Sequence, residues 1–245
     1  MVLRLRFFSS FLIWACGSVV FSAAAAFSLP RDQVEDKFGQ FLVYPVFLAP
    51  KDDQSRLNLV FVEDNENKKL TSPAFVIFSS AEKYLKSVKE ASEEMKDAKI
   101  VGVSVTKFLR LRREEEASQR SYGKTLLTPI ITPEVELLEA KKILLAEGVS
   151  STSIDQGLNV PIFYSNPMIV VNTNIGPRQA FFTSLRQMNS FIESKPVLKS
   201  AALKRRVADI NVVMKWMQEE PDDKYVVYPS PGYLEISPSA VTDQP

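Results

Sequence analysis

The same order of segments occurs twice along this chain of 245 residues. Each copy has a Pro-containing apolar run, a second apolar run, and a Phe-rich run that ends in hydroxyl residues. The three matched pairs are 44–48 with 160–164, 59–62 with 168–171, and 75–80 with 179–184. Internal repetition restricts the architecture more strongly than any single motif. We therefore expect a mixed α/β (α+β) fold that is internally duplicated into two lobes, each a small mixed sheet packed by amphipathic helices.

Composition and turn residues divide the chain into five stretches. They are a signal peptide at 1–26, a lead-in at 27–42, a first repeat lobe with a linking helix at 43–149, a second repeat lobe at 150–218, and a Pro- and Ser-rich tail at 219–245. We expect the tail to be mostly disordered. Tyr225 to Tyr228 are the exception, because this apolar run could add an edge strand.

The amino terminus has the pattern of a secretory signal peptide. Arg4 and Arg6 precede an apolar stretch from Phe7 to Phe21, and the small residues Ala24 to Ala26 follow. This order of basic, apolar and small residues predicts cleavage after Ala26. The alternative is an uncleaved membrane anchor, because Phe7 to Phe27 could just span a bilayer.

The absence of histidine excludes several classes of catalytic site. The chain contains no His and one Cys, Cys16, which lies within the predicted leader. Ser-His-Asp and Cys-His arrangements, thiolate metal sites and intrachain disulfides are therefore excluded. The formal net charge of +1 gives no basic field for nucleic acid. We expect no enzyme, no cofactor and no bound metal, although an enzyme that uses Asp or Glu alone stays open.

Two helix starts and one charged helix are predicted from spacing. Ser79 lies three residues before Glu82, and Ser184 lies three residues before Gln187, as in capping boxes. The stretch 106–119 predicts a helix in which Arg110 pairs with Glu114 and Arg112 pairs with Glu116 on a solvated face. The alternative for this stretch is a basic patch that binds anionic lipid or an acidic client. Val207 to Val213 predicts a strand, followed by a short closing helix that contains Trp216.

The repeated order resembles that of the Tic twenty-two family. The segments that carry the resemblance are Ala-Phe-Val-Ile-Phe-Ser-Ser-Ala-Glu-Lys at 74–83 and Asn-Val-Pro-Ile-Phe-Tyr at 159–164, and it extends over about 43–218. Members belong to the protein-import apparatus of plastid envelopes and have relatives in the cyanobacterial periplasm. The resemblance implies a soluble or peripheral translocon component of the intermembrane space. Such a component would assist preproteins in a chaperone-like way and would have no enzymatic activity.

The same resemblance implies partners and a location. The partners are translocating preproteins, other envelope translocon subunits and, peripherally, a membrane. The Ala-Phe junction at 26–27 resembles that of leaders that direct proteins to complex plastids of red-algal descent. We therefore expect the envelope or intermembrane space of an apicoplast or complex plastid, entered through the signal peptide. The acidic stretch 31–40 departs from an ordinary transit peptide.

A protein that holds unfolded segments needs an exposed apolar groove with polar edges. Aromatic residues and methionine suit this role because they offer large, adaptable contact areas. The candidates for polypeptide binding are Phe47, Phe61, Phe75, Phe163, Tyr164, Met168, Phe181 and Phe182. Ordinary core placement is the alternative for each, and Tyr164 and Met168 are the strongest candidates because they flank the Asn166-Pro167 turn. The alternative function is a secreted or periplasmic two-lobed protein that binds a lipid or small molecule.

Overall fold

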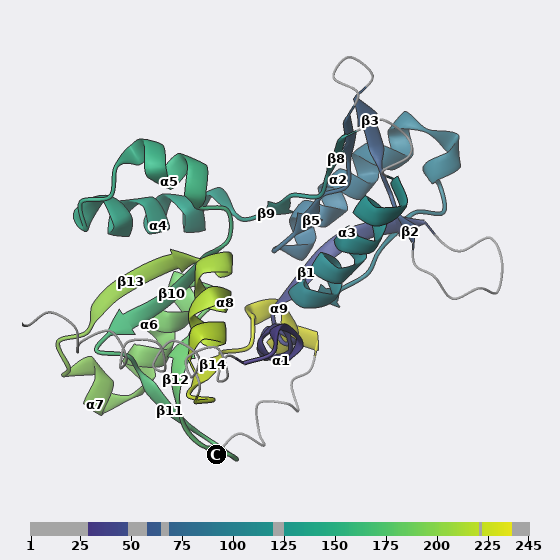
Figure 1. Ribbon diagram of the computed structural model, residues 1–245. Helices are drawn as coiled ribbons and strands as arrows, with labels where there is room; N and C mark the ends of the chain where they lie inside the picture. The colour runs from purple at the N-terminus through teal and green to yellow at the C-terminus, as the bar shows by residue number, and fades with distance from the viewer. Residues whose placement is uncertain (1–28, 49–57, 65–68, 120–124, 221, 237–245) are drawn as a thin grey trace, which may run out of the picture.

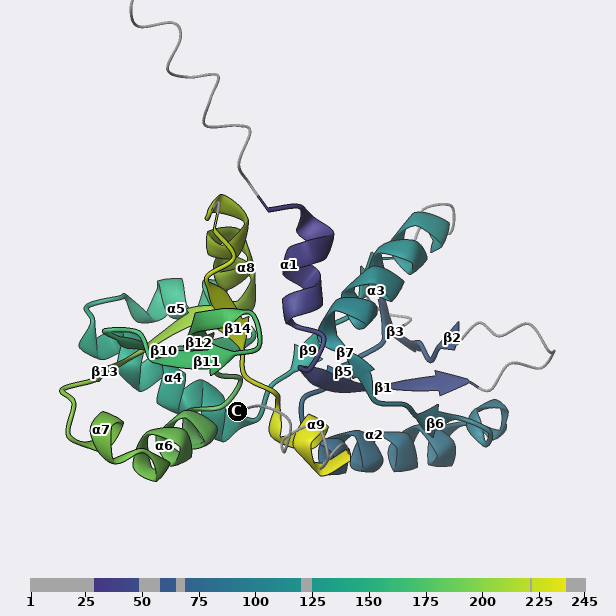
Figure 2. The same cartoon turned by 90° about the horizontal axis from the view of Figure 1, so that it is seen from below.

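The computed structural model describes residues 29–48, 58–64, 69–119, 125–220 and 222–236. These residues form two mixed α/β lobes, with α1 (Arg31–Lys37) and α9 (Pro231–Ile236) between them (Figures 1 and 2). Within these ranges no helix has both the length and the apolar character that crossing a bilayer requires. The predicted leader and its cleavage site lie outside the described residues.

The first lobe is organised around β1 (Leu42–Leu48), whose burial is nearly continuous. All four of its neighbours pair with it in the antiparallel direction. Along one edge lie β6 (Lys99–Ile100) and β7 (Val103–Ser104), and along the other lie β2 (Asn58–Leu59) and β5 (Ala74–Phe75). Because β5 and β7 both run opposite to β1, they are parallel to each other, with β1 inserted between them.

A second small sheet extends the first lobe. Its strands are β3 (Val62–Asp64), β4 (Lys69–Thr71) and β8 (Thr125–Leu127), and β9 (Ile130–Ile131) follows directly after β8. β4 is antiparallel to β3 and parallel to β8, while β5 is parallel to β9. Backbone hydrogen bonds from 72–76 to 127–131 continue from the β4–β8 ladder into the β5–β9 ladder, so the two parallel ladders are joined without a break.

The second lobe repeats this pairing pattern. Its strands are β10 (Pro161–Asn166), β11 (Val170–Thr173), β12 (Gly176–Phe181), β13 (Lys204–Asp209) and β14 (Tyr225–Val227). β10 is antiparallel to β13 on one side, and on the other it meets the end of β12 through an antiparallel bridge between Phe163 and Phe182. β12 is antiparallel to β11 and parallel to β14. Thus β10, β12 and β14 have the connections that β1, β5 and β9 have in the first lobe.

The helices cover these sheets. They are α2 (Phe78–Ala91), a 3₁₀ turn (Glu93–Met95), α3 (Val105–Gln119), α4 (Glu134–Ala146), α5 (Ser151–Gly157), α6 (Leu185–Ser194), α7 (Pro196–Lys199) and α8 (Ile210–Glu219). The predicted cap of α6 is confirmed, because Ser184 Oγ accepts a hydrogen bond from Gln187 N at 3.4 Å. The predicted cap at Ser79 is wrong. α2 begins at Phe78, with Ile77 at the cap position, two residues earlier than a cap at Ser79 requires, so the hydroxyl of Ser79 already lies inside the first turn.

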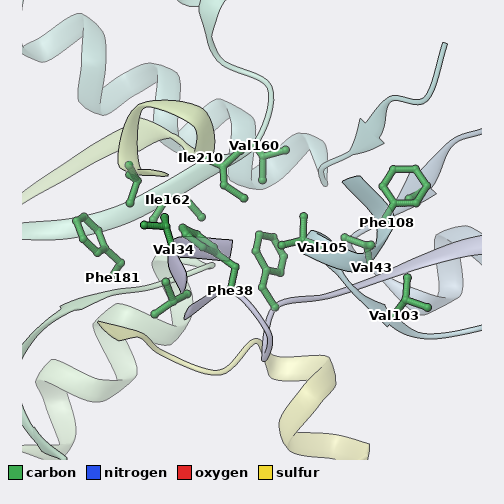
Figure 3. Packing of buried hydrophobic residues seen from close by; sticks show 14 of the residues in the cluster. Val34, Phe38, Val43, Val103, Val105, Phe108, Val160, Ile162, Phe181 and Ile210 are labelled. Atoms are coloured by element: carbon green, nitrogen blue, oxygen red, sulfur yellow. The ribbon is translucent and has the colours of Figure 1, made fainter. Parts of the chain in front are cut away.

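One buried apolar cluster continues through the junction of the two lobes (Figure 3). Val34 of α1 and Phe38, the residue that ends this helix, contribute to the cluster and are at most 1% exposed. Around them lie Val43 and Phe108 from the first lobe, and Ile162, Phe181 and Ile210 from the second. Burial of each large apolar side chain stabilises the fold by about 1.5–3 kcal/mol. The two lobes therefore share a core, and α1 lies within it.

The segment after α8 returns from the second lobe to the first. β14 extends the β11–β12 pair, so the predicted strand near Tyr225 is confirmed. Ser230 N then donates to Gln40 O at 3.0 Å, and Ser230 Oγ accepts from Leu42 N at 3.2 Å. The prediction of a mostly disordered tail is wrong for 222–236, because buried Val227 and this hydrogen bonding hold the segment in place. Residues 237–245 lie outside the described ranges.

Candidate polypeptide-binding surface

Five of the eight predicted contact residues belong to the core. Phe47, Phe163, Phe181 and Phe182 are at most 1% exposed, and Phe75 is 8% exposed. They occupy central strands or the residue that bridges two of them, where apolar side chains face the packed helices. A partner could contact them only if the core opened, so the structure assigns these five residues to packing.

The other three predicted residues are half-buried. Phe61, Tyr164 and Met168 all pack against the cluster at the lobe junction. The Tyr164 ring meets the Trp216 ring edge to face, with 5.8 Å between the ring centres. Trp216, on α8, is 36% exposed. Tyr164 therefore contributes to an aromatic surface, although part of its ring is committed to the core.

The hydroxyl of Tyr164 lies in an environment that disfavours its ionised form. Burial raises the pKa of Tyr164 above 10.0, and the carboxylate of Glu147 raises it further, while Arg206 acts in the opposite direction. Arg206 Nη1 and Glu147 Oε1 form an ion pair at 2.8 Å. Tyr164 is thus neutral at physiological pH and offers a polar edge beside an apolar ring.

A more exposed apolar surface lies on α4, the helix that follows β9 in the chain and packs on the second lobe beside β13 (Figure 1). Val135, Leu138 and Leu145 are 64%, 49% and 52% exposed. Their spacing of three and seven residues places them on one side of the helix. On the opposite side, fully buried Ala140 packs into the second lobe. We call Val135, Leu138 and Leu145 the α4 face.

A groove of about 390 Å³ runs beside the α4 face, between α4 and α6. Val135 and Leu185 form its apolar part. Glu136 joins its two walls, because it accepts hydrogen bonds from Ser184 Oγ at 2.7 Å and from Leu185 N at 3.1 Å. The remaining lining residues are Glu139, Arg186, Asn189, Ser190 and Glu193. The α4 face therefore continues into a groove that is apolar at Val135 and Leu185 and charged or polar elsewhere. An apolar patch beside polar side chains is an arrangement expected for contact with a polypeptide chain.

The sequence predicted a linking helix within 43–149, but none of the residues of this helix was selected as a contact residue. The available signal was the excess of apolar residues, since Val135 to Leu145 contains more of them than one buried face requires. Among the described residues, no group of three or more His, Cys, Asp or Glu side chains could hold a metal ion. The surface is suited to contact and offers no cluster for metal chemistry.

Comparison with known proteins identifies the fold. No family model matches the sequence, and a search of curated proteins finds no match. Among solved structures, Tic22 from Plasmodium falciparum matches with a TM-score of 0.62 and 18% identity, covering 86% of this chain and 99% of that one. Anabaena Tic22, described as a protein of protein transport, matches with a TM-score of 0.60 and 16% identity, covering 89% of this chain and 98% of that one. The resemblance in the repeated segments is thereby confirmed, and the chain has the Tic22 fold.

Proposed function

We propose that this protein is a component of plastid protein import, acting as a soluble or peripheral protein of the envelope intermembrane space. The observation that carries the proposal is the fold match over nearly the whole length of both Tic22 structures. The Anabaena protein is described as one of protein transport, which supports a role in transport. On this proposal the protein has no enzymatic activity, in keeping with the absence of histidine from the sequence.

We further propose that it binds preproteins in transit through the α4 face and the adjoining groove. Three large aliphatic side chains, each about half exposed or more, are available there without opening the core. Burying the exposed half of one such side chain is worth about 0.8–1.5 kcal/mol, and association itself costs at least about 4 kcal/mol, so other contacts along the groove must contribute as well. The balance is a weak and reversible contact. Such a contact suits a protein that must release its client again.

The test is binding of an unfolded model peptide, measured by fluorescence anisotropy. The triple variant Val135→Ser, Leu138→Ser, Leu145→Ser removes the α4 face. Because these side chains are exposed, we expect peptide affinity to fall at least ten-fold (about 1.4 kcal/mol) with little change in thermal stability. A matched control replaces three aliphatic residues exposed elsewhere, Val62, Val170 and Ile175, by Ser. Equal affinity of the two triple variants would refute the location.

The aromatic surface at Tyr164 is the rival location. Tyr164→Ala and Met168→Ala, measured in the same assay, distinguish it from the α4 face. If affinity and stability are both unchanged in these variants, the rival location is excluded. If they alone lose affinity, the binding surface lies on β10 and α8 instead of α4.

The import role itself is tested by imaging. A tagged full-length chain should overlap with a plastid marker, and its depletion should leave preproteins unprocessed outside the organelle. A signal in the cytosol or at the plasma membrane would contradict the proposal. The alternative of a lipid carrier finds little support, because the α4–α6 groove and a hollow of about 320 Å³ between α1 and α3 are lined mainly by charged and polar residues.

A further inference from the structure

Positive charge is concentrated at one corner of the second lobe. Residues 195–206 contain five basic residues and no acidic one, although the whole chain has a formal net charge of only +1. The five are Lys195, Lys199, Lys204, Arg205 and Arg206. Arg206 is neutralised by its ion pair with Glu147. The other four are exposed to solvent.

These four charges have no carboxylate partner within the ranges that the structure describes. The contacts made by Lys195 and Arg205 are with neutral groups. Lys195 Nζ lies 6.0 Å from the centre of the Phe191 ring, and Arg205 Nε donates to Asn189 Oδ1 at 3.2 Å. The nearest acidic residue along the chain, Glu193, lines the α4–α6 groove. The corner therefore has an uncompensated charge of about four.

An apolar side chain projects from the middle of this positive corner. Val197, on α7 between Lys195 and Lys199, is 80% exposed, the highest value among the large apolar residues described. Leu198 and Leu203 pack beneath it against the buried cluster of the second lobe. Leu198 N also donates to Lys195 O at 3.0 Å. Val197 is thus held on a fixed support.

The position of the corner allows contact with a flat surface. In both views α7 lies at the outer end of the second lobe, away from the first lobe (Figures 1 and 2). A projecting aliphatic residue can enter the interface of a bilayer while neighbouring lysines reach the lipid phosphates. Each Lys or Arg near an anionic leaflet contributes about 1 kcal/mol. Single-stranded nucleic acid would instead require exposed aromatic residues for stacking, and Val197 offers none.

We infer that the α7 corner, defined as Lys195, Val197, Lys199, Lys204 and Arg205, is a docking surface for an anionic lipid membrane. This surface is separate from the α4 face. It would hold the protein at a membrane while leaving the proposed polypeptide-binding surface accessible. Membrane binding at the α7 corner can therefore be confirmed or refuted independently of polypeptide binding at the α4 face.

The test is co-sedimentation with lipid vesicles that contain either phosphatidylcholine alone or phosphatidylcholine with phosphatidylserine. The protein is the chain as isolated from cells, and every variant must have the same N-terminus by mass spectrometry, so that leader residues cannot account for a difference. We expect binding to the anionic vesicles only, weakened by salt. Replacing all four basic residues of the corner by Gln should lower affinity about five-fold per charge, several hundred-fold in total.

A control with the same change of net charge replaces Lys83, Lys86, Lys89 and Lys99, all exposed on the first lobe, by Gln. This control variant should lose only a few-fold in affinity for the anionic vesicles. Val197→Ser should weaken binding several-fold, while Ile175→Ser, which alters another exposed aliphatic residue, should not. The inference is overturned if the native chain ignores anionic vesicles, or if the control loses as much as the corner variant. It is also overturned if the corner binds single-stranded nucleic acid or an acidic peptide more tightly than vesicles.

Discussion

Asp209 is the residue whose removal we expect to damage the second lobe most. Its side chain lies at the boundary of β13 and α8 and is 7% exposed. One carboxylate oxygen accepts hydrogen bonds from Asn159 N at 2.8 Å and from Val160 N at 3.1 Å. The other accepts from Asn211 N at 2.9 Å and Asn211 Nδ2 at 2.8 Å, which caps α8. One carboxylate thus fixes the start of β10 and the start of α8 together.

The cost of Asp209→Ala follows from these bonds. Loss of the helix cap costs about 1 kcal/mol. The buried amide of Val160 then loses its acceptor, at about 1–3 kcal/mol, and the part-buried amide of Asn159 loses a hydrogen bond worth about 0.5–1.5 kcal/mol. The expected total is about 2.5–5.5 kcal/mol, a large part of the roughly 5–15 kcal/mol that stabilises a typical domain. Asp209→Asn keeps one acceptor oxygen and should cost about half as much.

Urea denaturation followed by circular dichroism measures this loss. With a slope of about 2 kcal/mol per molar urea, Asp209→Ala should lower the midpoint by about 2 M. The matched control is Ser150→Ala, which removes the exposed cap of α5. Ser150 Oγ accepts from Ser153 N at 3.2 Å and lies 2.8 Å from Ser153 Oγ, and neither bond joins two elements distant in the sequence. If Asp209→Ala costs no more than this control, the bridging role of the carboxylate is refuted.

Three further substitutions test the junction and the aromatic surface. Phe38→Ala removes a fully buried ring from the shared core and should cost about 3–5 kcal/mol in thermal or urea unfolding. Gly232→Val should free the end of the chain to proteolysis, because any Cβ at this position collides with the hydroxyl of Tyr44. Glu147→Gln should lower the pKa of Tyr164, because the carboxylate raises it; near-ultraviolet absorbance follows the titration. Since folding raises that pKa above 10.0, the folded state should lose stability as the pH rises beyond that value, and less so in Glu147→Gln.

Each of these three predictions has a control variant. Val197→Ala truncates an exposed residue and should change the free energy of unfolding by no more than about 0.5 kcal/mol. If Phe38→Ala has an equally small effect, the shared core is contradicted. Gly157→Ala places a Cβ where no atom is near, and should not alter proteolysis. Tyr164→Phe identifies which phase of the absorbance titration belongs to Tyr164. If the pKa of that phase is the same in Glu147→Gln, the carboxylate of Glu147 does not raise the pKa of Tyr164.

The order of the strands could be predicted because it depends on apolar runs and turns that survive in both halves. The pairing of β10 with β13 and β12 resembles that of β1 with β7 and β5, which the order of segments alone did not specify. The boundary at Asp209 was missed. Val207 to Val213 is apolar enough for a strand, yet the strand ends at Asp209 and α8 begins at Ile210. A short apolar run does not distinguish strand from helix, and the helix cap supplied by Asp209 was the signal to use.

Contacts between distant helices could not be read from local spacing. The predicted pair of Arg112 with Glu116 is present, at 2.7 Å. Arg110, expected to pair with Glu114, instead lies 4.0 Å from Glu35 of α1, which also meets Arg113 at 3.1 Å. The carboxylate of Glu35 is almost completely buried, and only the docking of α1 onto α3 brings it there. The spacing rule finds neighbours on one helix and has no information about a partner from another.

The same limitation applies to the candidate surface. Aromatic residues in the strands were reasonable candidates by type, but central strands bury them. α4 is apolar on both sides, and its sequence does not show which side will be covered. Only its packing against β13 and β10 decides this, leaving Val135 and Leu138 exposed.

The lobe junction is completed by segments from opposite ends of the described chain, α1 and the stretch from β14 to α9. A nascent or threading polypeptide that has presented only residues 31–220 lacks the partner of Gln40 and the strand that borders β12. The junction is therefore completed only after the stretch from β14 to α9 has emerged. If the two repeats were expressed as separate chains, each would expose apolar side chains that belong to the shared core. The native structure would form only when the two chains associated.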